Sequence, residues 1–87
     1  MRNYVNVKLN SIDNAKEFTK ICEMFDEDID YVIGRYTIDA KSLLGILSTT
    51  LGKIAKVTIH TRSQNILEHF LNSIYKWIVE ESIWKLG

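Results

Sequence analysis

Apolar and polar residues alternate in four short stretches of the chain, and this spacing predicts β-strands. The first stretch covers about residues 4–9, where every second residue is apolar. Two more, at about 29–33 and 36–38, are separated by Gly34 and Arg35, a turn signal that joins them into a hairpin. The fourth covers about 55–59, with Ala55, Val57 and Ile59 on one face. Each strand therefore has one face suited to burial.

Three other stretches repeat their apolar residues at intervals of three and four, as amphipathic helices do. The first helix extends to about residue 25, and either Ser11 or Asp13 is suited to cap its N-terminus. The second covers about 40–47, with Asp39 as the expected cap. It contains Gly45, which weakens helix propensity by about 1 kcal/mol relative to alanine and often marks close packing.

The third helix begins near a candidate capping box, Thr61 with Gln64, and is expected to continue as one long helix to about residue 78. More apolar residues follow than one helical stripe needs. They are Trp77, Val79, Ile83, Trp84 and Leu86. Excess apolar surface usually marks a contact site, so a homo-oligomer through this C-terminal helix is one prediction. Packing of the helix on the domain's own sheet is the alternative.

The order of these elements is β-α-β-β-α-β-α. Strands with one apolar face and helices with one apolar stripe are satisfied by two layers. We therefore predict a single α+β domain over residues 1–87, an open-faced β-sandwich in which helices cover one face of an antiparallel sheet.

Composition narrows the class of protein. The chain has 87 residues, 11 basic and 11 acidic side chains and no net charge, which removes the simplest argument for nucleic-acid binding. A single cysteine rules out an intrachain disulfide and a cysteine zinc site, and it fits a cytoplasmic setting. No apolar run approaches the roughly 20 residues that span a bilayer, so we expect no membrane insertion. A core of this size leaves no room for a buried cofactor, and none is expected.

Reactive side chains are few. His60 and His69 fall on polar faces and share no metal spacing with a carboxylate pair, so both are interpreted as surface residues. Cys22 lies on the apolar face of the first helix and is interpreted as an inert core thiol. Between Asp39 and Glu68 the chain has cations but no acid, so this part could meet an acidic partner. The cations are Lys41, Lys53, Lys56 and Arg62.

The segment from Ile38 to Leu47 reads Ile-Asp-Ala-Lys-Ser-Leu-Leu-Gly-Ile-Leu and resembles the regulatory-serine region of HPr. HPr is the small phosphocarrier of the bacterial phosphoenolpyruvate-dependent sugar phosphotransferase system (PTS). That family carries the pattern N-x-K-S-[LIM]-[LM]-G-[VIL]-[LM] at the start of its second helix. The resemblance covers about residues 4–75, and the predicted order of elements is also that of HPr.

The resemblance implies an HPr-like fold and a role in the regulation of sugar transport in the bacterial cytoplasm. Ser42 matches the serine that the ATP-dependent HPr kinase modifies in Gram-positive bacteria. A phosphate there would meet the positive end of the helix dipole, with Lys41 beside it. Leu43, Leu44 and Leu47 resemble the patch by which HPr docks to its partners, so these residues and Lys41 are the predicted docking surface.

The chain departs from HPr where the family carries its phosphoryl group, on a histidine in a G-x-H-A-R-P motif before the first helix. That region here contains Ser11-Ile12-Asp13-Asn14 in a shorter loop. Either Ser11 or Asp13 falls at the histidine position, and neither can form a phosphoimidazole. Because a serine ester would be a poor phosphoryl donor, we expect no phosphocarrier activity and no enzymatic activity.

These features favour a regulatory protein that acts by binding, with PTS enzymes, HPr kinase or a regulator as the partner. Two alternatives stay open. One is a phosphocarrier that uses a displaced residue such as His60. The other is a non-catalytic module that self-associates through its C-terminal residues.

Overall fold

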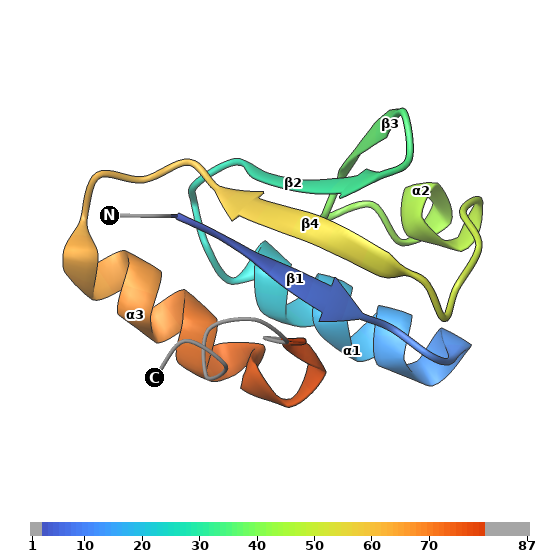
Figure 1. Cartoon of the computed structure of the whole chain (residues 1–87). Helices are drawn as coiled ribbons and strands as arrows, with labels where there is room; N and C mark the ends of the chain where they lie inside the picture. Colours follow the sequence, from blue (N-terminus) through green and yellow to red (C-terminus); the bar gives the residue numbers. More distant parts are fainter. Residues whose placement is uncertain (1–2, 80–87) are drawn as a thin grey trace, which may run out of the picture.

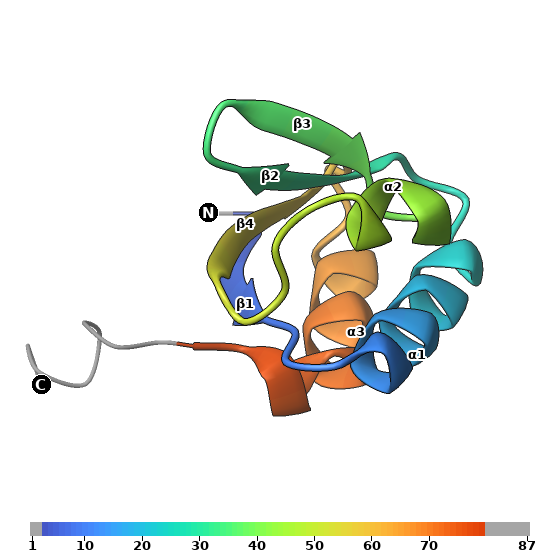
Figure 2. The ribbon, with the colours of Figure 1, turned by 90° about the vertical axis from the view of Figure 1, so that its right-hand side faces the viewer.

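The computed structural model describes residues 3–79, which form an α+β open-faced sandwich as predicted (Figure 1). The strands are β1 (Tyr4–Lys8), β2 (Ile29–Ile33), β3 (Tyr36–Asp39) and β4 (Ile54–Ile59). The helices are α1 (Ile12–Glu23), α2 (Leu43–Leu47) and α3 (Gln64–Ser73), followed by the short 3-10 helix η1 (Tyr75–Trp77). Figure 2 shows the helices on one side of the sheet and the other side open.

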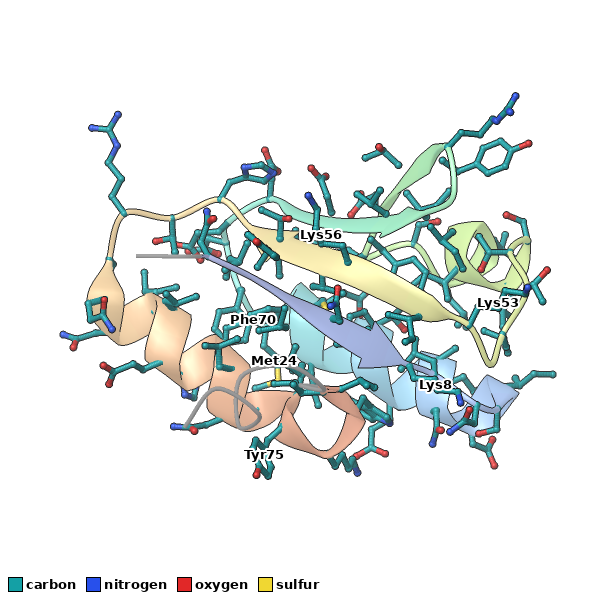
Figure 3. The ribbon with its side chains drawn as sticks, in the orientation of Figure 1. Lys8, Met24, Lys53, Lys56, Phe70 and Tyr75 are labelled. Carbon is teal, nitrogen blue, oxygen red and sulfur yellow. The ribbon has the colours of Figure 1, made fainter. Side chains whose placement is uncertain are left out.

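The sheet is antiparallel, with strand order β1-β4-β2-β3. Val57 of β4 lies opposite Val5 on one side and Tyr31 on the other, and all three side chains are buried under the helices. The alternation read from the sequence is confirmed, because Ala55, Val57 and Ile59 are all buried. Intervening residues such as Lys56 lie on the open face (Figure 3).

The helical layer buries the stripe predicted for the first helix. Phe18 of α1 is fully buried, and its ring contacts Tyr31 and Trp77 edge to face at centroid distances of 6.0 and 5.7 Å. Phe70 of α3 packs against Phe25 in the same manner at 5.3 Å. Each such ring stabilises the fold by roughly 1.5–3 kcal/mol through the area it removes from water.

The third helix differs from the prediction at both ends. It is capped by Ser63, whose Oγ accepts from the Ile66 N–H at 3.2 Å, while Thr61 Oγ1 accepts from the Ser63 N–H at 3.1 Å. The predicted Thr61 and Gln64 capping box is therefore wrong, because the helix begins after Ser63. It ends at Ser73 instead of continuing to residue 78, and η1 follows.

The end of the described chain packs on its own domain. Trp77 is 5% exposed, so the prediction that it is surplus to the core is wrong. Ile78 pairs with Val7, and the Val79 N–H donates to the Asn6 carbonyl at 2.7 Å, which places this segment beside β1. The other residues of the predicted C-terminal contact, Ile83, Trp84 and Leu86, lie outside the described residues.

The second helix is short, and its cap is Ser42 instead of the predicted Asp39. Ala40 is buried and its N–H still donates to the Ile29 carbonyl at 2.9 Å, so the chain leaves the sheet only after residue 40. Asp39 Oδ1 accepts from the Lys41 N–H at 2.9 Å, which forms a turn ahead of the helix. The Ser42 Oγ then accepts from the Gly45 N–H at 3.0 Å.

Gly45 marks the close packing that its place in the helix suggested. A Cβ atom at this position would lie 2.8 Å from Ile38 Cγ2, 3.0 Å from Ser42 Oγ and 3.3 Å from Ser42 Cβ. Ile38 is β-branched and rigid about χ1, so it cannot swing aside cheaply. The absence of a side chain at residue 45 therefore lets α2 rest directly on β3.

Replacing Gly45 by alanine should lower the free energy of unfolding by about 1–2 kcal/mol. Overpacking against Ile38 costs more than the roughly 1 kcal/mol that alanine returns in helix propensity. Urea unfolding followed by circular dichroism measures the change. The matched control is Leu44→Ala in the same helix, where the exposed side chain predicts a change within about 0.5 kcal/mol. Equal or higher stability of Gly45→Ala would contradict the close approach.

Candidate functional site

The start of α2 presents the predicted docking residues unequally. Leu44 is 82% exposed, whereas Leu43 and Leu47 are half-buried and pack against the core. Lys41 turns its ammonium away from solvent, because Nζ donates to the Phe25 carbonyl at 2.6 Å. Leu44 is therefore the member of this set that is available to a partner. The Lys41 side chain instead connects the turn before α2 to Phe25, which follows α1.

Ser42 is half-buried at the N-cap of α2. Its hydroxyl oxygen already accepts from the Gly45 N–H, and its carbonyl accepts from the Ile46 N–H at 3.0 Å. The unmodified hydroxyl therefore contributes to capping α2.

The loop before α1 is organised by two hydrogen bonds that both involve Asn14. Ser11 Oγ accepts from the Asn14 N–H at 3.1 Å, and Asn14 Oδ1 accepts from the Asn10 N–H at 3.2 Å. Of the two caps that the sequence left open, Ser11 is the one used. Ile12 is 56% exposed and Asp13 lies in the first turn, also exposed. Residues 11–14 thus form a helix cap with an exposed isoleucine.

A shallow hollow of about 590 Å³ lies between the two helices. It brings Asp13, at the start of α1, together with Leu43, a member of the predicted docking set. The remaining lining comes from α1, namely Lys16, Glu17, Thr19, Lys20 and Glu23. Charges of both signs alternate along α1 in this lining, with Leu43 as its apolar member, an arrangement suited to a protein surface of mixed charge.

The structure places the histidines on the surface, as expected. His60 follows β4, and its Nε2 lies 2.8 Å from Asp30 Oδ2. His69 is exposed on α3, with its ring 5.2 Å from that of Phe25. Within residues 3–79, no histidine, cysteine, aspartate and glutamate side chains are grouped closely enough to hold a metal ion.

The cations between Asp39 and Glu68 do not form one patch. Lys41 bonds to the Phe25 carbonyl, while Lys56 lies on the open face with Nζ 5.0 Å from the centre of the Tyr4 ring. Lys53 lies in the loop before β4 (Figure 3). The prediction of an acidic partner therefore gains no support from the arrangement of these charges.

Several exposed apolar residues were not predicted from the sequence, and two of them lie at the ends of elements. Tyr36, at the start of β3, is 63% exposed, and Met24, just after α1, is 75% exposed. The alternation around Tyr36 predicts a side chain on the helix-covered face of the sheet, and its pairing with Ile33 places it on that face. Tyr36 is nevertheless exposed because β3 lies at the edge of the sheet, and no local sequence pattern indicates which strand lies at an edge.

Comparison with known proteins adds no assignment, since neither a family model nor a curated protein matches the chain. None of the helices within residues 3–79 has the length and apolar character needed to cross a membrane.

Cys22 is wholly buried, and burial raises the pKa of its thiol to about 12 from the ordinary 9.0. In the unfolded chain the thiol ionises first as the pH rises. Its contribution to stability is therefore complete below about pH 9 and is lost as the pH approaches 12.

Cys22 should resist alkylation in the folded protein. At mildly alkaline pH, iodoacetamide should modify it at least about tenfold more slowly than in the same protein unfolded in guanidinium, because the buried thiol forms little thiolate. Mass spectrometry over time measures both rates. Equal rates would show that the thiol is accessible and would contradict its interpretation as a core residue.

Proposed function

We propose that this chain is an HPr-like regulatory domain that acts by binding a protein and not by carrying a phosphoryl group. The observation that carries the proposal is the 82% exposure of Leu44 on α2, next in the chain to Leu43, which lines the hollow along α1. Ile12 adds a second exposed apolar side chain at the start of α1. Large exposed apolar residues near a mixed-charge hollow are typical of a contact surface.

The resemblance between residues 38–47 and the regulatory-serine region of HPr supports the choice of partner. A partner that recognises the corresponding HPr surface, such as a PTS enzyme or HPr kinase, is the expected occupant. The protein would then compete with or mimic HPr in the cytoplasm and regulate sugar uptake.

The chemistry around Ser11 supports a role without phosphoryl transfer. Ser11 Oγ is held as the acceptor of the Asn14 N–H, and no basic group that could activate it is bonded to it within the described residues. A phosphate on this oxygen would be a stable ester. The reversible phosphoryl transfer of HPr uses the labile nitrogen bond of a phosphoimidazole, which this loop cannot form because it contains no histidine.

Ser42 is the proposed site of regulation. Its oxygen already lies at the first turn of α2, where added phosphate oxygens would find backbone N–H donors. The phosphate would bring about two negative charges next to Leu44. Modification at this point would therefore alter the docking surface directly.

Phosphorylation with two donors tests the chemistry. Incubation with HPr kinase and ATP should label the protein, and incubation with enzyme I and phosphoenolpyruvate should not. Ser42→Ala should remove the label at a stability cost of about 1 kcal/mol from the lost cap, with folding checked by circular dichroism. Ser48→Ala, at the other end of α2, is the matched control and should keep it.

An acid-labile label from enzyme I that disappears in His60→Ala would contradict the proposal and establish the displaced phosphocarrier instead. The structure gives that alternative one specific feature, since Asp30 orients an exposed His60 ring at 2.8 Å. No label from either donor would remove Ser42 from the regulatory role.

Calorimetric titration with enzyme I and with HPr kinase tests the binding surface. Leu44→Lys should weaken binding by about tenfold or more, because a central apolar anchor becomes charged. Stability should stay within about 0.5 kcal/mol, because the side chain is exposed. The control, Tyr75→Lys, alters a 74%-exposed residue on η1 and should leave binding unchanged. Equal binding by all three proteins would contradict the surface, and no binding to either probe would contradict the partner.

A further inference from the structure

The two outer edges of the sheet differ in what covers them. Along β1, Ile78 pairs with Val7, and the Val79 N–H donates to the Asn6 carbonyl. At the other edge, β3 pairs with β2 on one side, and no further element of residues 3–79 lies beyond it (Figure 2). One edge is thus covered by the chain itself and the other is open.

The hydrogen-bond pattern of the hairpin determines which backbone groups point away from β2. A two-residue turn joins the strands, so Ile33 and Tyr36, the first pair beside it, exchange hydrogen bonds. At the other end of β3, the Ala40 N–H donates to the Ile29 carbonyl, so Tyr36 and Ala40, four residues apart, both bond to β2. The residues between these pairs therefore alternate between bonding to β2 and facing outward.

Four backbone groups face outward along this edge. They are the N–H groups of Thr37 and Asp39 and the carbonyls of Arg35 and Thr37. Natural edge strands are often shielded by proline, lysine, a bulge or an inward-pointing charge. β3 has neither proline nor lysine, and its inward-facing residues are Tyr36 and Ile38. The edge therefore offers donors and acceptors in register with little to block a second strand.

We propose that β3 pairs in antiparallel orientation with β3 of a second copy of this chain, with Thr37 at the twofold axis. In this register the Thr37 N–H of each copy donates to the Thr37 carbonyl of the other. The Asp39 N–H of each copy donates to the Arg35 carbonyl of the other. All four outward groups of each copy are then used, and the two sheets become one.

The same register is complementary in its side chains. On the open face, Arg35 lies opposite Asp39 of the second copy, so the interface gains two symmetric ion pairs. On the helix-covered face, Tyr36 lies opposite Ile38 of the second copy. Pairs of this type, which exchange no hydrogen bonds, bring side chains closest together. Tyr36 is 63% exposed in the single chain, so pairing removes apolar surface from water.

A hollow of about 390 Å³ beside β3 provides room for the incoming ring. Its lining comes from the hairpin and from the segment that follows α2. These residues are Ile33, Gly34, Tyr36, Ile38, Ser48, Thr49, Thr50 and Lys53. Because Ile38 contributes to the lining, Tyr36 of the second copy arrives at the edge of this hollow. A net charge of zero leaves little repulsion between copies, while the four-residue length of β3 favours a weak, reversible dimer.

Sedimentation over a concentration series, with amide NMR on the same samples, tests the pairing. The full-length chain should dimerise reversibly, and the Thr37 and Asp39 amides should shift with concentration. Thr37→Pro should weaken the dimer by about tenfold or more, because it removes an outward N–H that β2 does not use. Arg35→Asp and Asp39→Arg should each weaken it similarly through like-charge contacts.

An equal mixture of the last two variants should recover the dimer, because each copy then meets the opposite charge on the other. Arg62→Asp makes the same charge change outside the hairpin and should dimerise as the unaltered chain does. If Asp39→Arg fails to fold, Thr37→Pro and Arg35→Asp still decide the matter. A monomer at every soluble concentration would overturn the proposal. So would a dimer that is indifferent to both of these variants, which would place the contact elsewhere.

Discussion

The pairing of β4 with strands on both of its sides is the constraint on which this fold depends. β1 comes from the start of the chain and β2 from a later part of it, and these two strands do not pair with each other. Only when β4 lies between them do Val5, Val57 and Tyr31 form one buried row across the sheet. The side chains of that row interact by packing, and the buried Tyr31 hydroxyl has no hydrogen-bond partner within residues 3–79. Each helix has one apolar face, and this row is what α1 and α3 are able to cover.

The position of the proposed docking surface follows from how the chain leaves this sheet. Ala40 remains bonded to Ile29, so the helix can begin only at Ser42, and Gly45 then allows it to rest on Ile38. Because the side of α2 that carries Gly45 packs on the sheet, Leu44 lies outside the core and faces solvent. The glycine within the serine motif is thus explained by packing, whereas the exposed leucine beside it is accessible to the proposed partner.

The sequence predicts the elements well and their ends poorly, for a physical reason. Burial alternates with the period of a strand or a helix, so Val57 or Phe18 is recognisable from its neighbours alone. A cap depends on where the preceding backbone is already bonded, which is why Ser42 and Ser63 serve where Asp39 and Thr61 were expected. The same limit applies to the site. The motif around Ser42 is visible in the sequence, but strand order and the hollow between α1 and α2 arise from long-range pairing that no local pattern encodes.

Two aspartates on neighbouring strands place like charges side by side on the open face, one on β2 and one on the edge strand β3. Asp30 and Asp39 are directly opposite each other on β2 and β3, an arrangement of like charges that destabilises a strand pair. Asp30 has a neighbouring cation whenever His60 is protonated, at 2.8 Å. Asp39 has only the backbone N–H of Lys41, whose ammonium is bonded elsewhere. Of these two carboxylates, Asp39 on the uncovered edge is therefore the one with less compensation from the described residues. A guanidinium arriving opposite Asp39 would relieve a repulsion already present in the single copy, so the edge favours a partner that brings a cation in that register.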